Sequence, residues 1–191
     1  MKALVLAGGE NRRFMSHKAL AEVNGRRIIE TAAGMLAKQF DQVWLSTNEP
    51  ELFFYLGLPM VGDLISVKGP MTGIYSGLVM TGADELFVVA CDMPFISEGL
   101  LEMMKSRYAG EDALIPVCNS RPEPLIGIYS ARLREVMREH ILQDRRSLQS
   151  LIRSISAVFL DERSVRTADP DCRSFININT PDEYRHLTAG A

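Results

Sequence analysis

The first apolar segment of the chain is followed by two glycines and then by three cationic side chains. The residues concerned are 3–7, Gly8, Gly9, Arg12, Arg13 and Lys18. Glycine lacks a Cβ, so a ligand can approach the backbone closely and the backbone N–H groups can turn toward it. An apolar run that ends in Gly-Gly is typical of a buried parallel strand entering a tight turn. Together with the cations, this pattern predicts a phosphate-binding site.

Further polar residues follow the other apolar runs of the chain. They are Asn48, Asp63, Asp92, Asn177 and Asn179. Ligands of open α/β sheets bind at the carboxyl ends of the strands, so these residues should meet along one edge with Gly8 and Gly9. The alternative for Asn177 and Asn179, which share one face of a predicted strand, is turn chemistry.

Asp92 directly follows the uncharged apolar run 86–91. A carboxylate in this position is suited to Mg²⁺, which takes oxygen ligands and keeps substrate phosphates in its remaining positions. An aspartate that caps a loop is the other interpretation, and this residue alone does not separate the two.

Two common nucleotide-binding motifs are absent from the sequence. A P-loop needs Gly-x4-Gly-Lys-Ser/Thr, and a dinucleotide fingerprint needs Gly-x-Gly-x-x-Gly; neither occurs at residues 8–13. A phosphate would therefore be bound by a different kind of loop.

Composition and charge are those of an ordinary globular domain. The 191 residues are 47% hydrophobic and 24% charged, with a net charge of −3, which gives no reason to expect nucleic-acid binding. Residues 1–38 hold seven Lys or Arg against three Glu, so this segment carries +4 and the remainder −7. A basic segment on an acidic body favours a local anion site, with solvated surface charge as the alternative.

Three cysteines and the start of the chain bear on location. Cys91, Cys118 and Cys172 are odd in number and have no zinc-site spacing. We therefore expect free thiols and a location in the reducing cytoplasm. We also expect neither a signal peptide nor a membrane-spanning segment.

Strands and helices alternate along the whole chain. Strands are expected at 3–7, 42–47, 59–63, 85–91, 113–118, 125–129, 157–161 and 175–179. Helices are expected at 28–38, 49–56, 74–80, 97–107, 130–142 and 147–155, with a last helix opened by the capping box at 180–183. A turn at 23–26 and loops at 68–73 and 119–124 separate some of them. The pattern predicts one α/β domain, a three-layer α/β/α sandwich on a Rossmann-like, mostly parallel sheet.

Seven segments together resemble one known family. They are Leu6-Ala7-Gly8-Gly9-x-x-x-Arg13…Lys18-Ala19-Leu20, Asn48, Gly62-Asp63, Gly69-Pro70-Met71-Thr72-Gly73, Cys91-Asp92-Met93-Pro94-Phe95, and Pro124–Tyr129 with Phe175–Pro181. This series resembles the nucleotidyltransferases with a GT-A-like (nucleotide-diphospho-sugar transferase) fold and, more narrowly, the molybdenum cofactor guanylyltransferase (MobA) family.

The resemblance implies transfer of GMP from GTP to the terminal phosphate of Mo-molybdopterin, with release of pyrophosphate. It implies a nucleotide half, 1–95, and an acceptor half, 96–191. It also implies Mg²⁺, with Mn²⁺ as the alternative ion, and transient contact with proteins that deliver or receive the cofactor.

The resemblance further implies roles for particular residues. Those implied to bind the nucleotide are Leu6, Ala7, Gly8, Gly9, Lys18, Asn48, Asp63 and Asp92. Those implied to act in catalysis are Arg13, Lys18 and Asp92, with the metal on Asp92. Those implied to face the pterin acceptor are Arg145 or Arg146, Asn177 and Asn179.

Two positions depart from the family pattern. Phe14-Met15 stands where Met-Gly is usual, and His17 stands where Asp is usual. Phe14-Met15 keeps open a non-catalytic carrier or chaperone of the cofactor. Two other enzymes are also alternatives: a molybdopterin cytidylyltransferase and a nucleotidyltransferase of another small metabolite.

Overall fold

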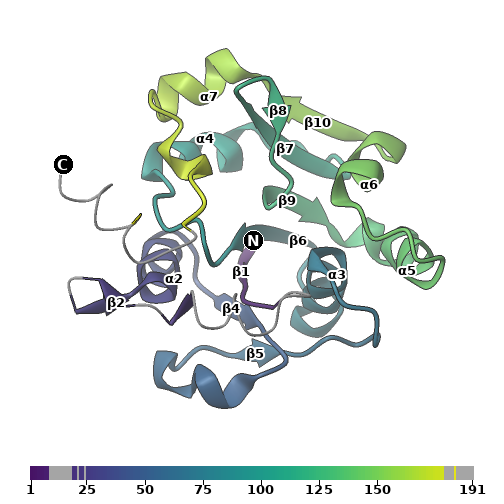
Figure 1. Cartoon of the computed structure of the whole chain (residues 1–191). Helices are drawn as coiled ribbons and strands as arrows, with labels where there is room; N and C mark the ends of the chain where they lie inside the picture. The colour runs from purple at the N-terminus through teal and green to yellow at the C-terminus, as the bar shows by residue number, and fades with distance from the viewer. Residues whose placement is uncertain (9–18, 21, 24, 179–182, 184–191) are drawn as a thin grey trace.

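A computed structural model describes residues 1–8, 19–20, 22–23, 25–178 and 183 of the chain. Its central sheet has the strand order β10-β7-β9-β6-β1-β4-β5, as Figure 1 shows from top to bottom. The strands are β1 Lys2–Leu6, β4 Val43–Ser46, β5 Met60–Val61, β6 Glu85–Ala90, β7 Ala113–Cys118, β9 Ile126–Ser130 and β10 Ala157–Leu160. β8 Arg121–Pro122 adds to β7, and β2 Glu22–Val23 pairs with β3 Arg26–Arg27.

Helices cover both faces of the sheet (Figure 1). One side carries α2 Ile28–Gln39, α4 Glu98–Arg107 and α7 Glu162–Ala168, and the other carries α3 Pro70–Thr81, α5 Arg134–Leu142 and α6 Leu148–Ser154. Single 3₁₀ turns occur at η1 Pro50–Leu52, η2 Phe54–Leu56, η3 Ala131–Leu133 and η4 Arg173–Phe175. The predicted three-layer α/β/α fold is confirmed.

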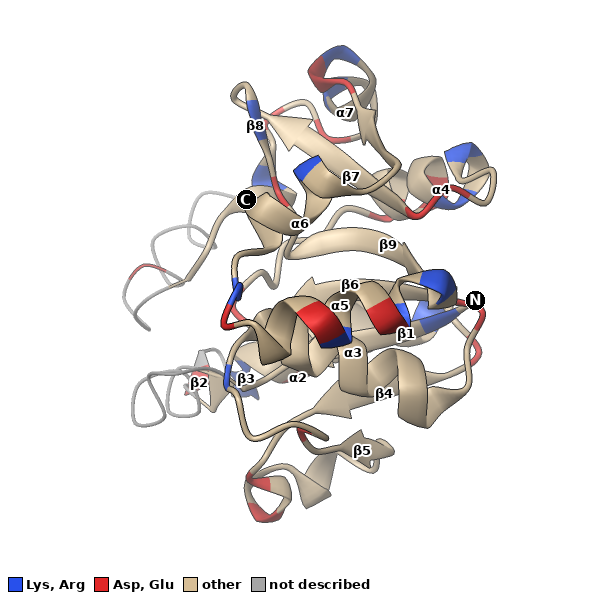
Figure 2. Cartoon of the chain, turned by 90° about the vertical axis from the view of Figure 1, so that its right-hand side faces the viewer, with Lys and Arg blue, Asp and Glu red and all other residues tan. Residues whose placement is uncertain are grey.

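The alternation of side chains along β1 separates two hydrophobic cores. Ala3 and Val5 face the core under α2 and α4, whereas Leu4 and Leu6 face the core under α3 and α5. Successive side chains of a strand point to opposite faces, so a strand buried on both faces must be apolar throughout. Figure 2 shows the result, since β4, β7 and β9 carry no charged residue.

The sheet is mixed because β9 runs antiparallel to both of its neighbours, β6 and β7. The other strands along the path pair in parallel, as β1 does with β4 and β6. The sequence places the segment 119–125 between two strand patterns without a helix, and a connection that short can only join antiparallel strands.

Three serines begin helices where the sequence predicts them. The Ser97 hydroxyl accepts a hydrogen bond from the backbone N–H of Leu100, at 3.0 Å. Ser147 makes the equivalent bond to α6 at 3.2 Å, and Ser130 caps the turn that leads into α5 at 3.3 Å. Each hydroxyl satisfies a backbone donor that has no partner inside its helix.

Other expected elements differ from the structure. α3 begins at Pro70 rather than at 74, because proline fits the first helical position without losing a needed N–H. The expected helix 49–56 is two 3₁₀ turns, and the expected loop 119–124 contains β8. α7 was not predicted; Asp161 caps it by accepting from the N–H of Ser164.

The expected strand 175–179 is wrong. Phe175 ends the turn η4, and residues 176–178 form no strand. The N–H of Ile178 bonds the carbonyl oxygen of Asp92 at 2.8 Å, and its buried side chain packs against Ile28 of α2. The alternation of apolar and polar residues here therefore reflects a single extended segment lying on the protein. The expected helix after Thr180 lies outside the described residues.

None of the helices in the described part of the chain is long and apolar enough to span a membrane.

Candidate functional site

Four neighbouring strands of the sheet end at the same level. Leu6 of β1 is paired with Ser46 of β4 and with Ala90 of β6, and Ser46 is paired with Val61 of β5. The ladder continues one residue further: Ala7 N–H bonds Ser46 at 2.9 Å and Cys91 N–H bonds Leu6 at 3.0 Å. The structure therefore brings Gly8, Asn48, Asp63 and Asp92 to one edge of the sheet.

The first of these strand ends offers backbone rather than side chains. Leu6 and Ala7 are 3% and 4% exposed, so only their main-chain groups can reach a ligand. A Cβ built on Gly8 would meet no described atom within 4 Å, which leaves open space at this point. Gly9, Arg13, Phe14, Met15, His17 and Lys18, like Asn179, lie outside the described residues.

Asn48 and Asp63 form a reciprocal pair at the next two strand ends. The Asn48 amide donates to Asp63 Oδ2 at 2.7 Å, and the backbone N–H of Asp63 donates to Asn48 Oδ1 at 2.8 Å. Burial raises the pKa of Asp63, while the bond from Asn48 and the charge of Lys68 act in the opposite direction. The pair holds a carboxylate in a fixed orientation, where it can accept N–H or O–H groups of a nucleoside.

Asp92 lies near enough to a second carboxylate, that of Glu123, for its charge to act on it. Glu123 accepts a hydrogen bond from the N–H of Leu125 at 3.0 Å, and the carbonyl of Leu125 accepts one from Ala90 at 3.0 Å. Burial raises the pKa of Glu123 most, and the charge of Asp92 raises it further; the bond from Leu125 opposes both. The turn before β9 therefore carries Glu123 to the end of β6.

Glu123 was not predicted as a site residue. Its signal in the sequence is slight, a single acid between Pro122 and Pro124. Its position depends on β9 running antiparallel between β6 and β7, which a search for polar residues after strands does not detect.

The donor set at Asp92 suits a magnesium or manganese ion. Within the described part of the chain no three acidic, histidine or cysteine side chains gather into a cage for a metal ion. Magnesium is commonly held by one or two carboxylates, with substrate phosphates and water completing its octahedron. Asp92, with Glu123 beside it, fits that pattern.

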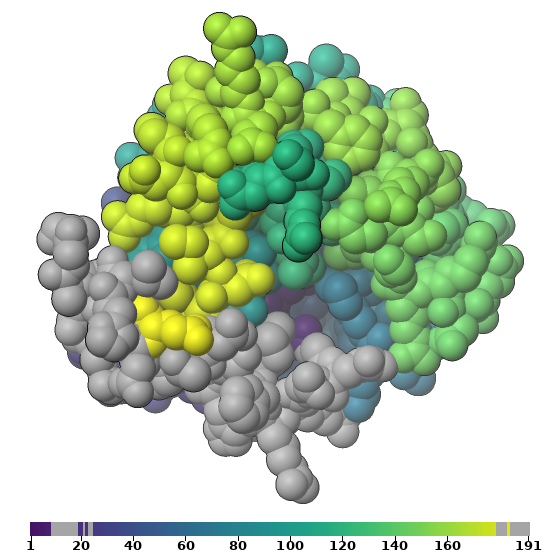
Figure 3. All heavy atoms as spheres, turned by 45° about the horizontal axis from the view of Figure 1, so that its top comes forward, coloured from purple at the N-terminus to yellow at the C-terminus, as the bar shows by residue number. Residues whose placement is uncertain are grey.

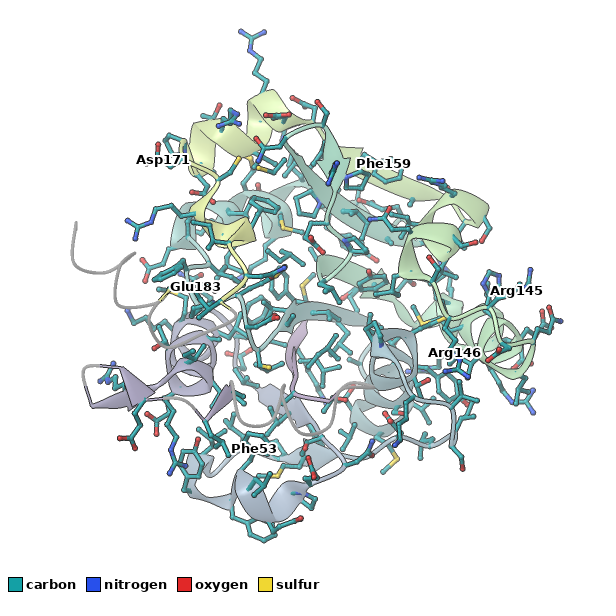
Figure 4. All side chains as sticks on the ribbon, in the orientation of Figure 1. Phe53, Arg145, Arg146, Phe159, Asp171 and Glu183 are labelled. Carbon is teal, nitrogen blue, oxygen red and sulfur yellow. The ribbon has the colours of Figure 1, made fainter. Side chains whose placement is uncertain are left out.

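The residues expected on the acceptor side lie on two separate segments. Asn177 is exposed just before Ile178, which is bonded to Asp92. Arg145 and Arg146 are exposed on the loop between α5 and α6, where Arg146 pairs with Asp144 at 2.7 Å. Figure 4 shows both arginines beside α5, on the opposite side of the molecule from Glu183. The structure does not bring them to the row of strand ends.

The loop of the two arginines nevertheless approaches the β7–β8 hairpin. Gln149, in the first turn of α6, donates to the carbonyl of Pro122 at 2.8 Å. Figure 3 shows a hollow on this face of the molecule, with atoms of the N-terminal residues (purple) at its floor and the hairpin (teal) above it.

Comparison with known proteins gives a consistent result. The family model for the MobA-like NTP transferase domain matches residues 3–159. A probable molybdenum cofactor guanylyltransferase of Peptoclostridium acidaminophilum is 36% identical over 97% of this chain and 87% of its own length. A molybdenum cofactor guanylyltransferase of Desulfosudis oleivorans is 30% identical over 97% of this chain and 93% of its own.

The fold also matches a solved structure over its full length. The crystal structure of molybdopterin-guanine dinucleotide biosynthesis protein A from Archaeoglobus fulgidus superposes with a TM-score of 0.81 at 27% identity. The match covers 100% of both chains. The expected family and the expected fold are therefore confirmed.

Proposed function

The chain belongs to the MobA-like NTP transferase family, and we propose that it is a molybdenum cofactor guanylyltransferase. The reaction is transfer of GMP from GTP to the terminal phosphate of Mo-molybdopterin, with release of pyrophosphate. The names of relatives that this chain matches over 97% of its length support this reaction. The observation that carries the proposal is the row of strand ends, where the Asn48–Asp63 pair and Asp92 flank the open backbone at Gly8.

The chemistry asks for alignment and charge neutralisation more than for proton transfer. An oxygen of the acceptor phosphate attacks the α-phosphorus of GTP, a new P–O bond forms, and the bond to the β-phosphate oxygen breaks. The attacking phosphate is already an anion near neutral pH, so no strong general base is needed. Bringing two anions together is the main cost, and electrostatic stabilisation lowers it.

Each part of the site has a role in this reaction. The backbone of Leu6, Ala7, Gly8 and Gly9 lies along the nucleotide phosphates, and Asn48 with Asp63 contacts the nucleoside. Lys18 and Arg13 neutralise the triphosphate. Asp92 would hold Mg²⁺ or Mn²⁺, and the bound ion would stabilise negative charge on the phosphates.

The second half of the chain mainly forms the acceptor side of the proposed site. Residues 1–95 form mainly the nucleotide half and 96–191 mainly the acceptor half, with Arg145 or Arg146, Asn177 and Asn179 toward the pterin. The three cysteines are free thiols, which suits a reducing cytoplasm. There, proteins that deliver or receive the cofactor would make transient contact with this protein.

A nucleotide panel tests the proposal. The protein is incubated with molybdopterin-loaded carrier protein, Mg²⁺ and each of the four NTPs in turn, and pyrophosphate is measured. Release with GTP alone supports guanylyl transfer. Release with CTP alone would show a cytidylyltransferase, and cofactor binding without any release would show a carrier.

A further inference from the structure

Two buried thiols that are far apart in sequence lie side by side in the fold. Cys118 is the last residue of β7, and Cys172 lies in the turn between α7 and η4. They are 6% and 5% exposed, belong to the same hydrophobic core and are hydrogen-bonded to each other through their side chains. Both are free thiols, and two thiols in contact need only a small movement to form an S–S bond.

The backbone at Cys172 has an unusual conformation that its surroundings hold in place. Its φ of 51° and ψ of 36° lie in the left-handed region, which residues with a Cβ rarely adopt. The buried carboxylate of Asp169 accepts hydrogen bonds from the N–H groups of Arg173 at 3.1 Å and Ser174 at 2.8 Å. The N–H of Cys172 bonds the Asp169 carbonyl at 3.0 Å. Strain that is held in this way is typical of functional positions, and here it presents a thiol to Cys118.

A fixed guanidinium acts on both sulfurs. Arg166 of α7 donates to Glu162 Oε1 at 2.9 Å and to the carbonyl of Pro170 at 2.9 Å. It also donates to Asn119 Oδ1, next to Cys118, at 3.0 Å. Its charge acts on both thiols and at Cys118 outweighs the opposing charge of Glu162. A neighbouring cation favours the thiolate, which is the reactive form of cysteine.

A small oxidant can reach the pair without unfolding of the protein. Cys118 lines an open cavity of about 390 Å³ between the β7–β8 hairpin and Phe175. A cavity of this size has ample room for molecules somewhat larger than water, such as hydrogen peroxide. Reactive thiols in reducing compartments are often redox sensors, with a second cysteine placed to complete a disulfide.

We propose that Cys118 and Cys172 form a reversible disulfide when the protein meets hydrogen peroxide. The Cys172 sulfur gives up its proton and attacks one peroxide oxygen; an S–O bond forms, the O–O bond breaks, and hydroxide leaves with that proton as water. The Cys118 sulfur then attacks the sulfenic acid; the S–S bond forms, the S–O bond breaks, and a second water leaves with the Cys118 proton. The two thiols lose two electrons in all, and the peroxide is reduced to water.

The order of the two steps follows from the environment of Cys118. Burial, the hydrogen bond with Cys172 and the charge of Cys172 raise the pKa of Cys118 to about 12. Cys118 therefore keeps its proton near neutral pH and is the second sulfur to react, whereas Cys172 is the first.

The disulfide would restrain a segment that leads to Asp92. It would link the end of β7 to residues 172–178, and the N–H of Ile178 at the end of this segment bonds the Asp92 carbonyl. A cross-link that closes a long loop stabilises a protein, mainly by restricting the unfolded chain. We therefore expect the oxidised protein to be more resistant to heat and this segment to exchange its amide hydrogens more slowly.

Peroxide treatment of the full-length protein tests the proposal. Remaining thiols are alkylated, and the protein is digested and analysed by mass spectrometry before and after dithiothreitol. We expect a loss of the mass of two hydrogen atoms and a linked peptide that joins Cys118 to Cys172, both reversed by the reductant. The thermal midpoint should rise by about 5–10 °C on oxidation and return on reduction.

Three variants make the test specific. Cys172→Gly suits the left-handed backbone and removes one sulfur, so peroxide should give neither the linked peptide nor the rise in midpoint. Cys91→Ala, which removes the third buried thiol, is the matched control and should show the same rise as the wild type. Arg166→Gln removes the charge but keeps an amide donor, so the disulfide should form several-fold more slowly.

Several outcomes would overturn the proposal. They are alkylation of both Cys118 and Cys172 after peroxide, oxidation of either sulfur to sulfinic acid without a link, and a disulfide that involves Cys91 or joins two molecules. An equal rise of the midpoint in Cys172→Gly would do the same. None of these measurements uses turnover, so their result is independent of whether the protein transfers a guanylyl group.

Discussion

Asp92 follows β6 by two residues, its charge acts on Glu123, and its backbone carbonyl accepts a hydrogen bond from the N–H of Ile178. A nearby cation would stabilise carboxylates whose charges act on each other, which supports the divalent metal ion that we propose at Asp92. We therefore propose that Asp92 has an electrostatic role in turnover and no role in the packing of the apolar core.

Replacement of Asp92 tests that role. Asp92→Ala should reduce Mg²⁺-dependent kcat by about 10²-fold or more, because a charge-stabilising group is lost. The thermal midpoint should change little, since the backbone carbonyl that bonds Ile178 is kept. Asp84→Ala is the control, because Asp84 is exposed at the opposite end of the same strand. Full activity in Asp92→Ala would remove this residue from the mechanism.

Asp63 gives a prediction for the pH dependence of stability. Its pKa is raised in the folded protein, mainly by burial, so the folded state keeps the proton to higher pH than the unfolded state does. The contribution of this group to the free energy of unfolding is therefore largest below its usual pKa and is lost as pH rises through the raised value.

Denaturant unfolding between pH 3 and pH 7 checks the sign. Asp63→Asn cannot ionise, so its free energy of unfolding should decline less, or rise more, over this range than that of the wild type. A wild type that gains more stability than the variant as pH rises would show that the bond from Asn48 and the charge of Lys68 outweigh burial.

At the scale of elements, α3 depends on two glycines for its close packing on β1. A Cβ on Gly73 would lie 2.8 Å from the Ser46 hydroxyl, and one on Gly77 would lie 2.5 Å from Leu4 Cδ2 and 3.0 Å from Leu86 Cδ2. α3 begins at the edge of the sheet where the site residues gather. Its close packing on the sheet therefore also fixes the position of the loop before Pro70.

Two glycine substitutions in helices should have opposite effects. Gly77→Ala should destabilise the protein by about 1–3 kcal/mol, because an overpacked core outweighs the better helix propensity of alanine. Gly34→Ala, on an exposed face of α2 where a Cβ would meet no atom of the described residues within 4 Å, should stabilise it by about 0.5–1 kcal/mol. Denaturant unfolding of both variants and of the wild type measures the two changes in the free energy of unfolding. Equal effects of the two changes would contradict the close packing of α3.

The elements that the sequence predicts well are those whose signals are local. Ser97 and Ser147 precede helices and accept the expected backbone bonds. β9 was expected as a strand, but its antiparallel direction follows from a connection of a few residues. The segment 175–179 has the alternation of a strand, yet the described residues 176–178 join no strand, and the N–H of Ile178 bonds the carbonyl of Asp92.

At the scale of the molecule, the site follows from one property of parallel strands, which is that their carboxyl ends meet at one edge. That rule brings Asn48, Asp63 and Asp92 together, although they are far apart in sequence. The same rule cannot find Glu123, because the turn that carries it precedes its strand. It also cannot place Arg145 and Arg146, which follow a helix.

The charge distribution supports the same arrangement. Residues 1–38 carry a net charge of +4, and the remainder of the chain carries −7. A basic segment in an acidic chain favours anionic ligands, because long-range attraction raises their local concentration.

The most direct test follows the α-phosphate of GTP. The protein is incubated with molybdopterin-loaded carrier, Mg²⁺ and GTP labelled at the α-phosphate, and the cofactor is released and separated. With the wild-type protein, we expect the amount of label in the pterin product to equal the amount of pyrophosphate released. With Asp92→Ala, we expect no label in the pterin product. Label that stays in free nucleotide while the pterin is unchanged would contradict guanylyl transfer by this protein.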